Sequence, residues 1–176
     1  MFRVVAIIFG LLGFICPQTA LAAEDPTMDV SIPQFIVAYN IAAGALNTSG
    51  LPAEPSKRQS GPAATVATYT ANKYAAVQIH YPPKNDRPKL ILFFGAGDGT
   101  EQSGFQMILG AISFVGALTP KMDGDSRGAV LKQLGLMPLA ITDGRQRTWR
   151  GQGMEMISQY NTSTGLMVGA GPAATR

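Results

Sequence analysis

The chain has 176 residues, of which 46% are hydrophobic, and its 14 Lys and Arg against 11 Asp and Glu give a formal net charge of +3 at pH 7. The basic residues of the mature region are scattered from Lys57 to Arg176. Nucleic-acid-binding proteins instead concentrate positive charge on one face, so we expect no nucleic-acid partner. A single cysteine excludes a framework of intrachain disulfides.

The first 22 residues have the pattern of an export signal. Arg3 is followed by an uncharged apolar run, Val4 to Ile15, and Ala20 and Ala22 place small residues at positions minus three and minus one of a cleavage site. As a helix, that run would reach about 18 Å, which is short against a hydrocarbon core of about 30 Å, so a cleaved signal fits better than a membrane anchor. We expect the mature chain to begin near Ala23 and to be periplasmic or secreted.

The only cysteine, Cys16, lies inside this leading segment, so the mature chain would contain no thiol. Exported proteins without cysteine are ordinary in a bacterial periplasm. His80 is the only histidine, so no Ser-His-Asp site can form without it and no zinc site can use two or more histidine or cysteine ligands. We expect no metal and no cofactor, and we place His80 on the solvated face of a strand.

Removing 22 of the 176 residues leaves 154, which is enough for one domain and too few for two. We therefore expect a single domain over residues 23–176.

The first helix is predicted from Pro33 to Leu46. Ser31 and Gln34 form a capping-box signature, apolar residues recur every three or four positions, and Asn47 ends the pattern. The segment 47–62 carries three prolines and two glycines, so we expect a mobile surface loop with no regular element.

Two strands, 64–70 and 74–81, are predicted to form a hairpin, and five consecutive apolar residues predict a more fully buried central strand at 90–94. Later strands are predicted at 139–142, 146–150, 154–160 and 166–168, with a frayed tail from Gly169. No transmembrane span is expected after signal cleavage.

A second helix is predicted from Phe105 to Leu118, and it is apolar nearly all round. This makes it either the most buried helix or a surface that docks on another component of a cell-envelope assembly. A third short helix should follow, capped by Asp125 or Ser126 and ended by Gly135. The order of elements predicts an α+β fold: a mainly antiparallel sheet of about four to six strands with two or three helices covering one face.

The run Gly95, Gly97, Asp98 and Gly99 is a candidate anion-binding loop, because it follows a strand and precedes a helix. An enzyme could use this loop with Asp98 or Glu101 as acid or base. The alternative is a structural turn, since neither the dinucleotide fingerprint nor the phosphate-loop ending is present and Asp-Gly is chiefly a turn former.

The turn 123–128 places aspartates at positions one and three and a glycine at position six, like the start of a calcium loop. Arg127 occupies position five, however, and Leu134 stands where a bidentate glutamate is needed. An acidic turn that caps a helix explains the run better.

Arg145, Arg147, Trp149 and Arg150 are the candidate partner-binding residues. In an extended chain Arg145, Arg147 and Trp149 share one face, and arginine and tryptophan are enriched at binding hot spots. A solvated edge strand whose tryptophan closes the core is the alternative. Together these patterns predict a small non-catalytic binding or accessory protein of the bacterial periplasm, chaperone-like or inhibitor-like, whose partner is another protein of the cell envelope.

Overall fold

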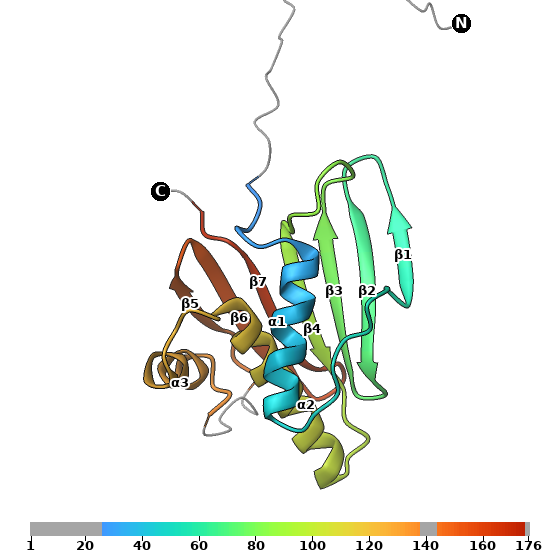
Figure 1. Cartoon of the computed structure of the whole chain (residues 1–176). Coiled ribbons are helices and arrows are strands. Elements are labelled where there is room, and N and C mark those ends of the chain that lie inside the picture. Colours follow the sequence, from blue (N-terminus) through green and yellow to red (C-terminus); the bar gives the residue numbers. More distant parts are fainter. Residues whose placement is uncertain (1–25, 138–143, 175–176) are drawn as a thin grey trace, which may run out of the picture.

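The computed structural model describes residues 26–137 and 144–174, which form one seven-stranded antiparallel sheet in the order β1-β2-β3-β4-β7-β6-β5, with three helices on one face (Figure 1). The helices are α1 (Ile32–Ala45), α2 (Glu101–Leu118) and α3 (Gly124–Gln133). The strands are β1 (Lys57–Ser60), β2 (Thr65–Asn72), β3 (Ala75–Tyr81), β4 (Leu90–Gly95), β5 (Arg147–Gly151), β6 (Met154–Asn161) and β7 (Gly165–Pro172). The predicted α+β class with helices over one face is confirmed, and the sheet has more strands than expected.

Helix α1 begins as its capping box predicts. The Ser31 hydroxyl accepts a hydrogen bond from the Gln34 amide at 3.4 Å, and the Gln34 side chain accepts one from the Ser31 amide at 2.9 Å. Asn47 has φ of 51° just beyond the helix, in the left-handed region that asparagine tolerates better than most residues.

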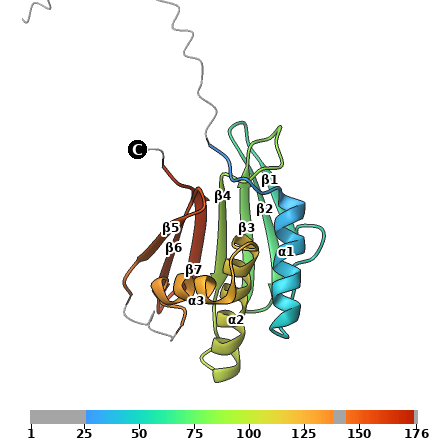
Figure 2. The same cartoon turned by 60° about the vertical axis from the view of Figure 1, so that its left-hand side comes forward.

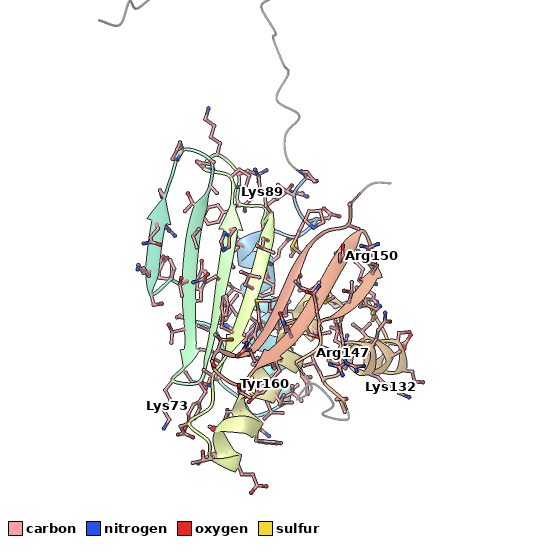
Figure 3. All side chains as sticks on the ribbon, turned by 180° about the vertical axis from the view of Figure 1, so that it is seen from behind. Lys73, Lys89, Lys132, Arg147, Arg150 and Tyr160 are labelled. Atoms are coloured by element: carbon pink, nitrogen blue, oxygen red, sulfur yellow. The ribbon has the colours of Figure 1, made fainter. Side chains whose placement is uncertain are left out.

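The β2–β3 hairpin and the central position of β4 are confirmed. Strand β4 is not buried on both faces, however: Ile91 and Phe93 are fully buried under the helices, whereas Leu92 and Phe94 are half-buried on the opposite face. No described helix covers that opposite face, which Figure 3 shows with the helices behind the sheet. An antiparallel sheet with one covered face buries alternate residues in this way.

The prediction that segment 47–62 holds no regular element is wrong, because it contains the edge strand β1. Lys57 pairs with Thr68 and Ser60 with Thr65, so the prolines flank the strand rather than interrupt it. All four β1 residues are exposed, and two of them are charged. Charged side chains on a short edge strand discourage pairing with another chain.

The prediction of a frayed tail from Gly169 is also wrong. Strand β7 continues to Pro172 and pairs with β4 on one side and β6 on the other, and Ala170 is 1% exposed. A Cβ at Gly169 would lie 3.0 Å from the Leu92 side chain, so a residue without a side chain fits between the neighbouring strands. The predicted strand at 139–142 lies outside the described residues.

An aromatic cluster joins the helix layer to the centre of the sheet. The ring centroids of Phe35 and Phe114 are 5.9 Å apart, those of Phe93 and Phe114 are 6.1 Å apart, and those of Phe35 and Tyr39 are 6.2 Å apart. All four side chains are fully buried. This cluster ties α1 and α2 to β4 at the middle of the molecule.

Helix α2 begins at Glu101 rather than Phe105, because Thr100 is its N-cap and accepts from the Ser103 amide at 3.2 Å. Helix α3 is capped by Asp123, not by the predicted Asp125 or Ser126, and Gly135 ends it with φ of 70° as expected. None of the helices in the described ranges has both the length and the apolar character needed to cross a bilayer.

Candidate binding surfaces

The predicted anion-binding loop joins β4 to α2, and its aspartate is fully engaged by neighbouring residues. Asp98 Oδ2 accepts from the Tyr74 hydroxyl at 2.8 Å, while Oδ1 accepts from the hydroxyl and the amide of Thr100 at 2.6 Å and 3.1 Å. Lys73 Nζ lies 3.9 Å from Oδ2. The carboxylate therefore ties the loop to the β2–β3 turn.

The hydrogen bonds from Thr100 and Tyr74 hold the pKa of Asp98 well below its usual range. The carboxylate is thus ionised near neutral pH and is a poor proton donor. The N–H groups of Thr100 and Ser103 at the start of α2 already bond to side chains of this chain. This arrangement favours the structural interpretation of the loop over the anion-binding one.

Asp98, Glu101 and Glu155 are carboxylates that an enzyme could use if they converged, and Glu155 lies at the other end of the sheet from the glycine loop. Glu101 is exposed on the first turn of α2. Glu155 bonds to Arg150 at 3.0 Å and pairs with Gly171 near the far end of β7. His80 is half-buried rather than solvated, and its Nε2 is enclosed with no hydrogen-bond partner among the described residues.

A cleft of 310 Å³ lies between the glycine loop and the β6–β7 turn, and hydroxyl groups dominate its lining: Thr100, Ser103, Tyr160, Thr162, Ser163 and Thr164. Close packing explains the glycines around it. Gly165 has φ of 82°, and a Cβ there would collide with the carbonyl oxygen of Gly95. A Cβ at Gly97 would lie 2.9 Å from Ser103 Oγ. Gly99, with φ of 86°, supplies the left-handed turn.

A larger cavity of 460 Å³ lies at the other end of the molecule, and we name it the N-terminal cavity. Its walls are residues 27–30, the C-terminal end of α2 with Pro120 and Lys121, and the β5–β6 turn with Met154. Sequence reasoning missed it, because these three segments are far apart along the chain.

The four candidate partner-binding residues do not form one continuous surface. Arg147 pairs with Ser158 and Trp149 with Met156, which puts both on the helix-covered face, and Trp149 packs against the core. Arg150 lies on the opposite face beside Glu155 (Figure 3). Arg145 precedes the strand, and its carbonyl accepts from Arg147 Nη1 at 3.4 Å. The strand is an edge strand, as the alternative interpretation held.

The outer face of α1 exposes large apolar side chains that sequence reasoning did not single out. Val37 is 60% exposed and Ile41 is 70% exposed, one helical turn apart. Phe105 on the neighbouring helix α2 is 61% exposed, although most of the predicted 105–118 segment is buried. The signal was visible in the sequence, since α1 contains no charged residue and has apolar positions on both of its faces.

Within residues 26–137 and 144–174, no group of three or more His, Cys, Asp or Glu side chains could hold a metal ion. The chain matches no protein-family model, no curated protein and no solved structure.

Proposed function

We propose that this chain is an exported, non-catalytic binding protein of the bacterial cell envelope that contacts a protein partner through the outer face of α1. The observation that carries the proposal is the exposure of Val37 and Ile41, at 60% and 70%, on a helix without a charged residue. Single exposed apolar residues are normal, and it is the position of these two on one uncharged helical stripe that supports a contact surface.

The energetics of burial support this role. Covering a Val or Ile side chain contributes about 1.5–3 kcal/mol, so two adjacent side chains supply a useful share of a specific interface. Apolar residues four positions apart on one helix are also the pattern by which helices dock into grooves. Pro33, Gly44 and Ala45 continue the exposed stripe without adding charge.

Phe105 is a further exposed apolar side chain of the helix layer. Helices α1 and α2 lie side by side (Figure 2), and Thr48, after α1, donates a hydrogen bond to Gln106 of α2 at 2.9 Å. We therefore include the start of α2, around Phe105, in the proposed docking surface. The sequence predicted docking through the whole segment 105–118, and the proposal keeps only its exposed start.

The state of Asp98 fits a structural role better than that of a general acid. Asp98 accepts hydrogen bonds from Tyr74 and Thr100 and stays ionised, which is unsuited to a general acid. Export rests on the signal pattern of residues 1–22 and on the cysteine-free mature chain.

The test places a photo-crosslinking amino acid at position 37 or 41 of the full chain in its bacterial host. We expect one major protein adduct at both positions and none at Lys132, an exposed position on α3. Ile41→Glu should abolish the adduct formed from position 37, because it puts a charge on the contact surface. The matched variant Ala129→Glu adds the same charge to an exposed site on α3 and should leave the adduct unchanged.

Both glutamate variants should change the free energy of unfolding by less than about 0.5 kcal/mol, as expected of exposed sites. The absence of adducts at positions 37 and 41, or equal adducts at Lys132, would contradict the docking surface. Export is tested separately by measuring the mass of the chain recovered from the periplasm. We expect the mass of a chain that begins at Ala23. A full-length chain found only in the cytoplasm would contradict export.

A further inference from the structure

The N-terminal cavity is formed by three segments from different parts of the sequence. Met28 and Val30 come from the start of the described chain, Ala117 and Leu118 from the end of α2, and Met154 from β6. These side chains are apolar, and Thr27, Asp29, Lys121 and Gln152 add polar and charged groups to the lining. A volume of 460 Å³ falls within the range of about 300–1,000 Å³ that is typical of small-molecule sites.

The wall made by residues 27–30 is fixed by specific contacts. The Met28 amide donates to the Pro88 carbonyl at 2.7 Å, and the Ile32 amide donates to the Asp86 carbonyl at 3.0 Å. Arg87 binds Asp29 at 2.7 Å between these two points. The segment is therefore held against the β3–β4 turn, so the cavity is a formed feature of the fold, as small-molecule sites usually are.

The opposite wall is the tight turn between β5 and β6. Gln152 and Gly153 have φ of 52° and 73°, which are values of a type I′ hairpin turn. The Gly153 carbonyl also accepts from the Ala173 amide at 2.9 Å, which anchors the turn to the end of β7. Met28 and Met154 both line the cavity, and their flexible side chains can adapt to an apolar chain.

The cavity lining contains two charged side chains, Asp29 and Lys121. Asp29 is committed to Arg87, whereas Lys121 is exposed and has no ion-pair or hydrogen-bond partner among the described residues. The carbonyls of Thr119 and Met122 at this end of α2 accept hydrogen bonds from Arg127 at 3.0 Å and 2.9 Å. These carbonyls at the negative end of the helix thus already have a donor, and Lys121 is the unpaired charged side chain of the cavity lining among the described residues.

We propose that the N-terminal cavity binds a single-chain amphiphile with a carboxylate head, such as a free fatty acid. The chain enters between Met28, Leu118 and Met154, and the carboxylate lies at Lys121. This site is separate from the outer face of α1, so the proposal goes beyond the proposed docking function and does not depend on it.

The experiment titrates the folded mature chain, from Ala23 to Arg176, with laurate and with dodecanol, two probes with the same chain length and different heads. Binding is followed by calorimetry and by amide chemical shifts. We expect saturable laurate binding that shifts the amides of residues 27–30 and 152–154. Lys121→Gln should weaken laurate binding about tenfold, which corresponds to about 1.4 kcal/mol, and leave dodecanol binding unchanged. The matched variant Lys132→Gln on α3 should bind both probes like the unmodified chain.

A second variant tests the apolar part of the site. Met154→Gln puts a polar side chain of similar length on the cavity wall, and it should weaken both probes while its thermal transition stays cooperative. Laurate binding that does not saturate, or that shifts amides elsewhere, overturns the proposal. Equal laurate affinity in Lys121→Gln overturns it as well. If the chain floats with phosphatidylglycerol vesicles and does not bind laurate, the region around the cavity contacts a membrane, and the proposal of a fatty-acid site is overturned.

Discussion

The Tyr39 hydroxyl is fully buried beneath the helix layer and has no hydrogen-bond partner among the described residues. Burial raises the pKa of Tyr39 from 10.0 to about 12. Since the folded pKa lies above the unfolded one, ionisation of this group costs no stability below pH 10.0, and the free energy of unfolding falls as pH rises from 10.0 toward about 12. Between pH 10.0 and about 12, Tyr39 ionises in the unfolded chain but stays protonated in the folded one, and this difference favours unfolding.

Tyr39→Phe should raise the free energy of unfolding at pH 7 by about 1 kcal/mol, because it removes a buried hydroxyl that makes no hydrogen bond. It should also reduce the loss of stability between pH 10 and pH 11. Urea unfolding at these pH values measures both effects, with Tyr160→Phe at a half-buried position as the control. A loss of 1 kcal/mol or more at pH 7 would mean that the hydroxyl makes a stabilising contact.

At the scale of a helix, two glycines differ in what surrounds them. A Cβ at Gly110 of α2 would lie 2.9 Å from the Phe93 ring and 3.5 Å from the Tyr39 hydroxyl. A Cβ at Gly128 of α3 would meet nothing within 4 Å. Gly110 lets α2 approach the sheet closely. Gly128 has no such packing role, and glycine has a low helix propensity.

Gly128→Ala should therefore stabilise the protein by about 0.5–1 kcal/mol, since it restores helix propensity at no steric cost. Gly110→Ala should destabilise it by about 1–3 kcal/mol, because overpacking against Phe93 outweighs the same gain in propensity. Urea unfolding of the two variants in parallel measures the difference. Shifts of the same sign would show that propensity alone governs both positions.

The sequence predicted those helices and strands that short-range interactions along the chain determine. The Ser31 and Gln34 capping box and the apolar spacing of α1 are short-range features, and so is the β2–β3 hairpin. Strand β1 and the end of β7 were missed because pairing partners decide them. Lys57 becomes part of a strand only through its pairing with the β2 strand, and Ala170 only between β4 and β6. The prolines and glycines in those two segments instead favoured a loop and a frayed tail.

The candidate sites divide in the same way. The engagement of Asp98 by Tyr74, which is 24 positions away, could not be read from the loop sequence. The N-terminal cavity depends on segments from both ends of the chain. The exposed stripe on α1 could have been predicted, because a helix of 14 residues without a charge has too many apolar positions to bury all of them on one face.

At the scale of the whole molecule, the sheet consists of two meanders that meet only at the β4–β7 ladder. Strands β1 to β4 follow one another on one side, β5 to β7 on the other, and Ile91–Gly95 pairs with Leu166–Ala170 at the junction. The aromatic cluster around Phe93 packs over the β4 side of this junction. Because α2, α3, β5 and β6 lie between β4 and β7 along the chain, pairing across the junction closes a long loop, and we expect it to form only together with the rest of the domain.

Native-state hydrogen exchange should follow this arrangement. Amides of β4 and β7 that bond within the ladder should exchange only through global unfolding, while the exposed edge strand β1 should exchange through local opening at a much lower free energy. Val168→Ala, a large-to-small change in a fully buried residue of β7, should lower the protection of β3 and β6 by the same amount, about 1–3 kcal/mol, because both meanders depend on the shared ladder. If Val168→Ala lowers protection in β5 to β7 alone, the two meanders unfold independently. If β1 is protected as strongly as β4, the prediction that β1 opens locally at a lower free energy is wrong.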